Sequence, residues 1–369
     1  MTEQHNTQIS TQTNTQYSLN TNLSITDPSL VKTSAWLSLI SYYPQDELKR
    51  LIEAEFSIAK ENISCINVTA RKTDTDFVIF HTHDCIVLAF SGSRPSSFKD
   101  WITTDFDHDL TSAFGMGHED IKVHAGFLNA LNSCWEKINV ELIKRWKIIS
   151  KNTLSSPMVL ITGHSLGGAL ANLTAATIAR QAQETSRRTT ATTKIMKDIL
   201  NVIKVQTFGQ PRIGDKNFQQ WYNKIKGLSN NTLRHVNHYD VVPHLPPRDE
   251  IIWFKCFDPG WVHVGQQWLY SHDGQVDKIT KHRDVPELFF GGIPKPITLT
   301  CSVIDHMPWR YLWVAEGLDG KPNVQRRIEE AVFFSRFAST AMGRLIKLKY
   351  NRLINTPKLL FGSEQSKAS

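Results

Sequence analysis

The sequence lacks a long hydrophobic segment. No apolar run reaches the roughly 18 residues that a membrane-spanning helix requires. The first 22 residues are rich in Thr, Gln and Asn and have no apolar core, so they do not form a Sec-type signal peptide. The default expectation is therefore a cytoplasmic protein, with export by a non-Sec route left open.

Cysteine is also scarce. The chain has 5 cysteines, an odd number without regular spacing, which argues against a disulfide framework. No CxxC pair or His/Cys cluster indicates structural zinc, and no calcium-binding loop motif is visible. We therefore expect no metal and no cofactor.

Charge of one sign is only mildly in excess. Lys and Arg number 42 and Asp and Glu 35, which gives a net charge of +7. Such an excess favours contact with anionic surfaces, including phospholipid headgroups. It is too diffuse to indicate nucleic-acid binding, and no base-reading motif accompanies it.

What the sequence does contain is material for a large core, since 40% of its 369 residues are apolar. We divide the chain into a disordered polar tail (1–25), a globular α/β domain (26–320) and a basic amphipathic helical extension (321–369). The stretch Gln183 to Asp198 is polar and is predicted to be a surface insertion.

Hydrophobic periodicity predicts that helices and strands alternate along the domain, which is typical of an α/β fold with a sheet that is parallel at its centre. The predicted helices are two within Ser29 to Ile58, interrupted near Tyr43-Pro44, one at Ala125 to Ile149 and one at Leu166 to Ala182. The predicted strands are Asp76–Phe80, Cys85–Phe90, Pro157–Thr162, Ile203–Phe208, Thr232–Asn237 and Trp261–Tyr270.

One pentapeptide is a candidate catalytic motif, Gly163-His164-Ser165-Leu166-Gly167. It lies between a buried strand and a helix, which is the context of a nucleophile elbow. Such an elbow exposes the serine hydroxyl on a strained turn, and only small flanking residues fit there. Ser165 is therefore the predicted nucleophile, and the backbone N–H of Leu166 is a predicted oxyanion donor. His164 is expected to be a structural neighbour rather than the base.

The segment from Gly163 to Ala171 closely resembles the elbow of the class 3 lipases, the fungal-type triacylglycerol lipase family. Other segments resemble that family in the same order, across about residues 65 to 315. They are Val123-His124-Ala125-Gly126-Phe127, the run from Phe208 to Asp215, the run from His238 to Pro247, and Asp305-His306 followed by Tyr311.

The resemblance implies an α/β-hydrolase fold, a mostly parallel central sheet flanked by helices, that hydrolyses carboxylic esters. It implies Ser165 as nucleophile, Asp240 as orienting acid and His306 as base. Asp215 is a rival acid, although its place beside a glycine suits a turn or a helix cap. The histidines after the acid that also fit the chain order are His244, His263, His272 and His282. For His263 a packing or hydrogen-bonding role in a strand is the plainer interpretation.

Ser93 is the second predicted oxyanion donor. It lies in Ser91-Gly92-Ser93-Arg94-Pro95, which follows an early strand and resembles the family's oxyanion loop. Ser91 departs from the family pattern, which usually has Arg there. An ordinary Ser/Gly turn is the alternative.

Two further segments leave alternatives open. Phe98 to Phe106 is amphipathic and predicts either a lid or a solvated helix. Val332 to Ile354 carries five basic residues and no acidic one, with an apolar helical face. That pattern is typical of a helix on an anionic membrane, or of one that packs on the domain.

The combined hypothesis is a serine carboxylic ester hydrolase that acts on lipids, of triacylglycerol lipase or phospholipase type, through an acyl-enzyme. The alternatives are a thioesterase or acyltransferase on the same fold, and a non-catalytic membrane-associated scaffold. The expected partner is a lipid or other ester substrate.

Overall fold

The fold is described from a computed structural model of the chain. Residues 1–15, Phe98–Phe106, the histidines at 272 and 282 and the extension 321–369 fall outside the described ranges, so the expectations for them remain predictions. The described ranges are 16–70, 73–93, 109–114, 120–152, 157–183, 190–237, 240–246, 260–270, 276–279, 289–290, 293–294 and 305–317.

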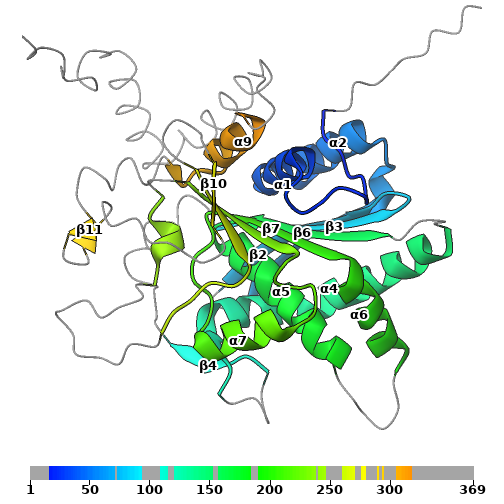
Figure 1. The fold of residues 1–369 in the computed structure, drawn as a ribbon. Coiled ribbons are helices and arrows are strands. Elements are labelled where there is room, and N and C mark those ends of the chain that lie inside the picture. Colours follow the sequence, from blue (N-terminus) through cyan, green and yellow to red (C-terminus); the bar gives the residue numbers. More distant parts are fainter. Residues whose placement is uncertain are drawn as a thin grey trace, which may run out of the picture.

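An eight-stranded sheet forms the centre of the described structure, in the order β1-β2-β3-β6-β7-β8-β9-β10 (Figure 1). Strands β3, β6, β7, β8 and β9 are parallel, and the outer pairs are antiparallel. This confirms the predicted mostly parallel sheet. The strands are β1 (Ile63–Ala70), β2 (Thr73–His81), β3 (Cys85–Phe90), β6 (Met158–His164), β7 (Ile203–Phe208), β8 (Thr232–Asn237), β9 (Gln266–Tyr270) and β10 (Val276–Ile279).

Helices cover both faces of the sheet (Figure 1). On one face lie α1 (Pro28–Ile40), α2 (Gln45–Phe56) and α9 (Pro308–Gly317), with α1 packed on β6, β7 and α9. On the other lie α4 (Ala125–Asn152), α5 (Leu166–Gln183), α6 (Ala191–Val202) and α7 (Lys216–Lys224). Shorter elements are η1 (Lys60–Asn62), β4 (Leu110–Ser112), β5 (Lys122–His124), η2 (Val242–His244), β11 (Phe289–Phe290) and β12 (Ile293–Pro294).

Strand β3 shows why two hydrophobic cores form. Successive side chains of a strand point to opposite faces of the sheet. Ile86 and Leu88 therefore enter the core beneath α4 and α5, whereas Val87 and Ala89 enter the core beneath α1 and α9. A continuous apolar run is consequently the signature of this buried strand.

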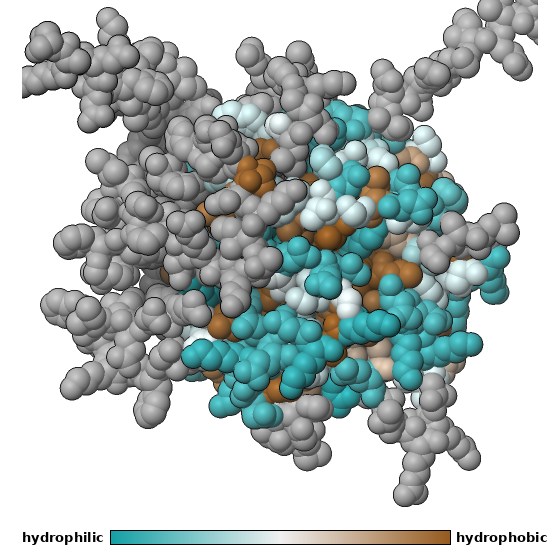
Figure 2. Space-filling view, viewed as in Figure 1, coloured by the Kyte–Doolittle hydropathy of each residue, from teal (hydrophilic) through white to brown (hydrophobic). Residues whose placement is uncertain are grey.

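Polar side chains cover much of the described surface in Figure 2, and apolar ones appear between them in small areas. The large apolar side chains that are exposed in the described residues are Val140, Ile148 and Trp313. Within the described ranges, none of the helices is both long enough and apolar enough to cross a membrane.

The prediction of a surface insertion over Gln183 to Asp198 is wrong for the second half of that stretch. Ala191–Val202 forms the helix α6, whose first turn is capped by the Thr190 hydroxyl. Met196 and Ile199 from this helix are buried against the core. Apolar residues at helical spacing were present in the stretch, but the polar residues around them concealed the pattern.

The expected strand from Trp261 to Tyr270 is too long. Only Gln266–Tyr270 pairs as β9, because Gly265 adopts a φ of 75° and interrupts the extended backbone. Before it, Val262 makes only an isolated bridge to Gly214.

The expected disordered tail also ends earlier than residue 25. Tyr17 is buried and stacks on Trp36 of α1, with ring centroids 4.6 Å apart. The Gln206 amide donates to the carbonyl of Ile25 at 2.9 Å, and the Lys204 ammonium donates to the carbonyl of Thr21 at 3.1 Å. Residues 16–25 therefore belong to the folded domain.

Candidate active site

The turn between β6 and α5 holds Ser165 in a strained conformation. Its φ is 57°, in the left-handed region that non-glycine residues rarely occupy. The Ser165 N–H donates to the carbonyl of Phe208 at 2.8 Å, and the Ser165 carbonyl accepts from Gly168 at 3.0 Å. The turn is crowded, since a Cβ on Gly163 would lie 2.3 Å from the carbonyl oxygen of Gly167. These features are those of a nucleophile elbow.

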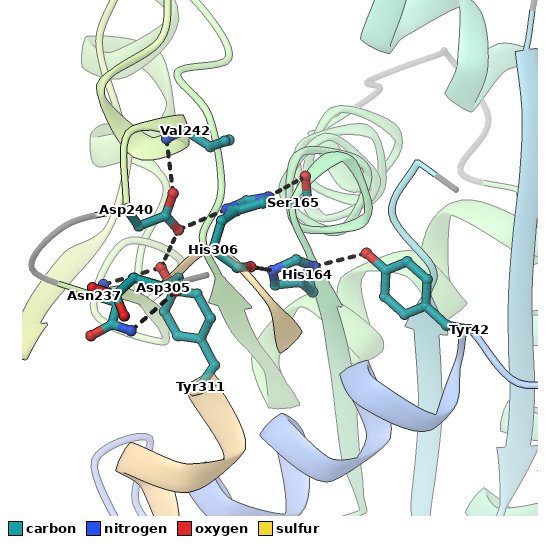
Figure 3. A network of polar contacts seen from close by, with 9 residues as sticks. All are labelled: Tyr42, His164, Ser165, Asn237, Asp240, Val242, Asp305, His306 and Tyr311. Carbon is teal, nitrogen blue, oxygen red and sulfur yellow. Dashed lines mark hydrogen bonds and ion pairs between the residues drawn. The ribbon is translucent and has the colours of Figure 1, made fainter. Parts of the chain in front are cut away.

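His306 lies directly against the elbow, just before α9. Its Nε2 is 2.9 Å from the Oγ of Ser165, and its Nδ1 is 2.7 Å from Oδ2 of Asp240 (Figure 3). All three side chains are buried, with 2%, 1% and 0% of Ser165, His306 and Asp240 exposed. The structure thus brings together three residues that are 141 and 66 positions apart in the chain.

Asp240 is held by further donors. Its Oδ1 accepts from the N–H of Val242 at 2.9 Å, and its Oδ2 accepts from the hydroxyl of Tyr311 at 2.5 Å as well as from His306 (Figure 3). An ionised carboxylate is acceptor-only, so the hydrogen bond to His306 requires the proton on Nδ1. Nε2 of the neutral imidazole then presents a lone pair to Ser165. This arrangement can take the proton from the serine hydroxyl.

Tyr311 keeps its own proton in this environment. Burial raises the pKa of Tyr311 well above its usual value, and the charge of Asp240 raises that pKa further. The Tyr311 oxygen also accepts from the N–H of Asn237 at 3.1 Å. Tyr311 is therefore a fixed hydrogen-bond donor to the carboxylate.

One predicted oxyanion donor belongs to the elbow, and the other belongs to a loop that lies against it. Leu166 is the first residue of α5, so its N–H has no partner within the helix. Ser93 follows Gly92, and a Cβ on Gly92 would be 3.1 Å from the Cβ of Ser165. The loop that carries Ser93 therefore runs in contact with the elbow. Ser91, where the resemblance implies Arg, donates from its N–H to the carbonyl of Asp76 at 3.0 Å.

The rival residues lie elsewhere and have structural contacts. Asp215 caps α7 by accepting from the N–H of Phe218 at 2.7 Å. His263 donates from Nε2 to the carbonyl of Pro243 at 2.7 Å. His244 belongs to the short helix η2, and its carbonyl accepts from Arg212. None of these three makes a hydrogen bond to Ser165 among those that the structure describes.

Sequence reasoning missed the roles of Tyr42, Asn237 and Tyr311 in this network (Figure 3). The Asn237 side-chain amide donates to the carbonyl of Asp305 at 3.1 Å, which fixes the residue before His306. Only Tyr311 had a signal, because it forms part of the resemblance around His306. The other two lie on separate elements, and no spacing in the sequence connects them to Ser165.

Within the described ranges, no group of three or more His, Cys, Asp or Glu side chains is arranged to hold a metal ion.

A comparison with protein families identifies the segment that contains the elbow. Residues 87–250 match the family described as lipase, class 3. This segment of the chain is therefore similar to the class 3 lipases. It includes Ser165 and Asp240, whereas His306 lies beyond it.

Curated relatives agree with this assignment. The chain is 28% identical over 282 residues to triacylglycerol lipase OBL1 of Arabidopsis thaliana, covering 67% of this chain and 48% of the relative. It is 27% identical over 237 residues to a lipase of Rhizomucor miehei, covering 63% of this chain and 53% of the relative. The chain thus spans about half the length of these curated relatives.

A solved structure shows the same fold. It is a triacylglycerol lipase whose catalytic centre is described as a serine protease triad. It superposes with a TM-score of 0.50 at 21% identity, over 74% of this chain and 97% of that one. The α/β-hydrolase fold predicted from the sequence is confirmed.

Proposed function

We propose that the protein is a serine carboxylic ester hydrolase that acts on lipid esters. The observation that carries the proposal is the continuous chain of hydrogen bonds from Ser165 through His306 to Asp240, at 2.9 and 2.7 Å. A buried imidazole between a serine hydroxyl and a carboxylate is the arrangement that activates a serine for acyl transfer.

In the acylation step, His306 Nε2 takes the hydroxyl proton as Ser165 Oγ bonds to the ester carbonyl carbon. The carbonyl oxygen becomes an oxyanion, for which the N–H groups of Leu166 and Ser93 are the proposed donors. Collapse of this intermediate breaks the bond to the alkoxy oxygen, and His306 gives its proton to the leaving alcohol. Asp240 stabilises the charged imidazole between these two transfers.

In the deacylation step, a water molecule replaces the alcohol. His306 takes one proton from the water while its oxygen bonds to the acyl carbon, and a second oxyanion forms. When the bond to Ser165 breaks, the proton returns to Oγ and the carboxylic acid leaves. The enzyme is thereby restored, and one water is consumed for each ester bond.

The proposed substrate class rests on the relatives. The two relatives compared above are named lipases, one of them a triacylglycerol lipase, and residues 87–250 of this chain match the class 3 lipase family. Lipid esters are therefore the first substrates to test. Triacylglycerols, phospholipids and short p-nitrophenyl esters, compared over a range of acyl chain lengths, will identify the preferred acyl chain and headgroup.

The decisive variant is Ser165→Ala. We expect it to abolish hydrolysis of p-nitrophenyl butyrate and covalent labelling by a fluorophosphonate probe, because the labelled oxygen is removed. Ser133→Ala is the matched control, since Ser133 lies on α4 and its hydroxyl donates only to the carbonyl of Ala130 among the described contacts. Ser133→Ala should retain full activity and labelling.

Two outcomes would contradict the proposal. One is labelling that persists in Ser165→Ala. The other is a folded wild-type protein that hydrolyses no ester and takes up no probe. A wild type that is labelled but transfers its acyl group mainly to a thiol or an alcohol acceptor would instead reassign the reaction to an acyltransferase.

A further inference from the structure

A second line of hydrogen bonds approaches the site from the side opposite Asp240. The hydroxyl of Tyr42, two residues beyond the end of α1, is 2.8 Å from Nδ1 of His164. Nε2 of His164 is 2.5 Å from the backbone carbonyl oxygen of His306 (Figure 3). His164 is the residue before the proposed nucleophile, so this series of hydrogen bonds includes a residue of the elbow itself.

The direction of each hydrogen bond follows from the groups involved. A carbonyl oxygen only accepts, so His164 carries a proton on Nε2. Burial lowers the pKa of His164 well below its ordinary value, and the neighbouring His306 lowers that pKa further, so the ring is neutral. Its Nδ1 is then an acceptor, and the Tyr42 hydroxyl must donate to it.

The Tyr42 oxygen has a partner on its other side. Burial raises the pKa of Tyr42, and the backbone of Gly92 lowers it to a smaller extent, as a nearby N–H does. The line of hydrogen bonds therefore runs from Tyr42 through His164 to the carbonyl of His306, and the backbone of Gly92 lies against the Tyr42 oxygen.

Both ends of this line adjoin the proposed machinery. Gly92 immediately precedes Ser93, a proposed oxyanion donor, and His306 is the proposed base. Gly92 is closely packed, since a Cβ there would lie 2.2 Å from the Tyr42 hydroxyl and 2.7 Å from the carbonyl oxygen of His164. The Tyr42 hydroxyl thus sets how closely the oxyanion loop approaches the elbow.

Helix α1 and the residue after it are hydrogen-bonded to the strands that end at the site. The Ser38 hydroxyl is 2.8 Å from the Thr162 hydroxyl on β6, and the Ser41 hydroxyl donates to the carbonyl of Phe90 at 3.3 Å. Ser38 and Ser41 are both buried. The segment before Tyr42 therefore has a fixed position relative to β3 and β6.

We propose that Tyr42 and His164 are positioning residues. They fix the positions of the oxyanion loop and of His306 relative to Ser165. This role rests on the proposed hydrolase function. It extends the site to residue 42, which lies outside the family match over residues 87–250.

The consequence for catalysis is geometric. Oxyanion donors act when they lie about 2.7–3.1 Å from the position that the oxyanion will occupy. Without the Tyr42 hydroxyl, Nδ1 of His164 loses its partner and Gly92 loses the atom against which it lies, which favours a shift of the loop. Such a shift weakens binding of the transition state more than binding of the substrate, so kcat falls and KM does not.

The test is Tyr42→Phe, which removes only the hydroxyl. We expect kcat for p-nitrophenyl butyrate to fall by about ten- to a hundredfold, less than the loss of a whole oxyanion donor, with KM changed by less than about threefold. Affinity for a trifluoromethyl ketone, which forms a tetrahedral adduct with the serine, should fall by the same factor as kcat/KM.

Tyr270→Phe is the matched control. Tyr270 is fully buried, whereas Tyr42 is partly buried, and the Tyr270 hydroxyl also bonds to the Nδ1 of a histidine, His235, at 2.6 Å. Neither residue of this pair makes a hydrogen bond to Ser165 or Gly92 within the described ranges, so Tyr270→Phe should lose at least as much thermal stability and keep kcat within about twofold. A Tyr42→Phe enzyme with kcat within twofold of wild type, or a Tyr270→Phe enzyme impaired equally, would overturn the positioning role.

His164 gives a second test that remains available if Tyr42→Phe does not fold. In His164→Gln the amide supplies one donor and one acceptor, as the neutral imidazole does, whereas His164→Leu supplies neither. We expect Gln to retain most of kcat and Leu to lose at least tenfold at an equal melting temperature. Equal kcat in the two variants would overturn the proposal. A wild type that is inactive toward every ester overturns the proposed function first, and the positioning role with it.

Discussion

The hydroxyl of Tyr311 donates to the same carboxylate oxygen of Asp240 that accepts from His306, at 2.5 Å and 2.7 Å. The carboxylate of Asp240, the proposed acid, therefore has its position fixed from α9 as well as from its own loop.

Tyr311→Phe should lower kcat by about tenfold and leave KM unchanged, because a hydrogen bond to a charged group contributes about 1.5–3 kcal/mol and only part of it acts through the imidazole. Steady-state kinetics on a soluble ester measure the effect. Tyr222→Phe is the control, since Tyr222 is equally buried but bonds to Thr232 and Asn172. Equal kcat losses in both variants would mean that Tyr311 acts only through stability.

Gly209→Ala should impair both stability and activity. Gly209 has a φ of 60°, and a Cβ there would lie 2.8 Å from Oδ2 of Asp240 and 3.0 Å from the His306 ring. We expect a stability loss of about 1–2 kcal/mol from the left-handed backbone, and a separate fall in kcat as the pair is displaced. Gly227→Ala separates the two effects, because Gly227 has a φ of 80° but its nearest neighbour is 3.9 Å away. Urea unfolding should show a loss in both variants, and assays a loss only in Gly209→Ala.

Substitutions of the two candidate acids, Asp240 and Asp215, should have different effects on activity and stability. Asp240→Asn should reduce kcat by about 10⁴-fold through the wrong imidazole tautomer. Asp215→Ala should instead cost about 1 kcal/mol of stability, because it removes the cap of α7, and leave kcat near the wild-type value. Activity at matched folded fractions checks both. If Asp215→Ala proved the more damaging to kcat, the assignment of the acid would be reversed.

Stability should fall in mild acid. Burial, and to a smaller extent the nearby Arg234, lower the pKa of His235 from 6.5 to about 3. Below pH 6.5 the unfolded chain binds a proton that the folded chain does not, so this contribution is complete above pH 6.5 and is lost as the pH falls toward 3. The slope is at most about 1.4 kcal/mol per pH unit for this group. Urea unfolding between pH 7.5 and 4.5 should show a shallower slope in His235→Gln. The exposed His83, substituted in the same way, is the control, and identical slopes in wild type and His235→Gln would refute the effect.

The N-terminal segment should contribute to stability. Tyr17 is 5% exposed and stacks on Trp36, so Tyr17→Ala should cost about 3 kcal/mol, as large-to-small substitutions of aromatic side chains do. Ser18→Ala, at the neighbouring exposed position, should change little. A loss below about 0.5 kcal/mol in Tyr17→Ala would show that the contact with α1 does not persist in solution.

The elements with strong periodicity were predictable. The helices α4 and α5 and the strands β3, β6, β7 and β8 each have a distinct apolar pattern and lie close to their predicted ranges. The strand β1 and the helix α6 were missed, because their apolar residues are mixed with polar ones and gain burial only from the tertiary structure. The burial of residues 16–25 has the same origin, since Tyr17 is buried only because Trp36 lies where it can stack on it.

The site was predictable to a similar degree. Local motifs indicated Ser165, and the resemblance supplied Asp240 and His306. Tyr42 could not be found in this way, because its partner His164 is 122 positions away and a single tyrosine after a helix carries no pattern. Contacts that unite distant elements become visible only in three dimensions.

The separation of Ser165 and His306 by 141 positions also imposes an order on biosynthesis. At roughly 5–20 residues per second, the ribosome makes the histidine about 7–28 s after the serine. The helix α1, made early, meanwhile lacks α9, its neighbour in the finished domain. A nascent chain therefore carries the proposed nucleophile for several seconds before the base that would activate it has been synthesised.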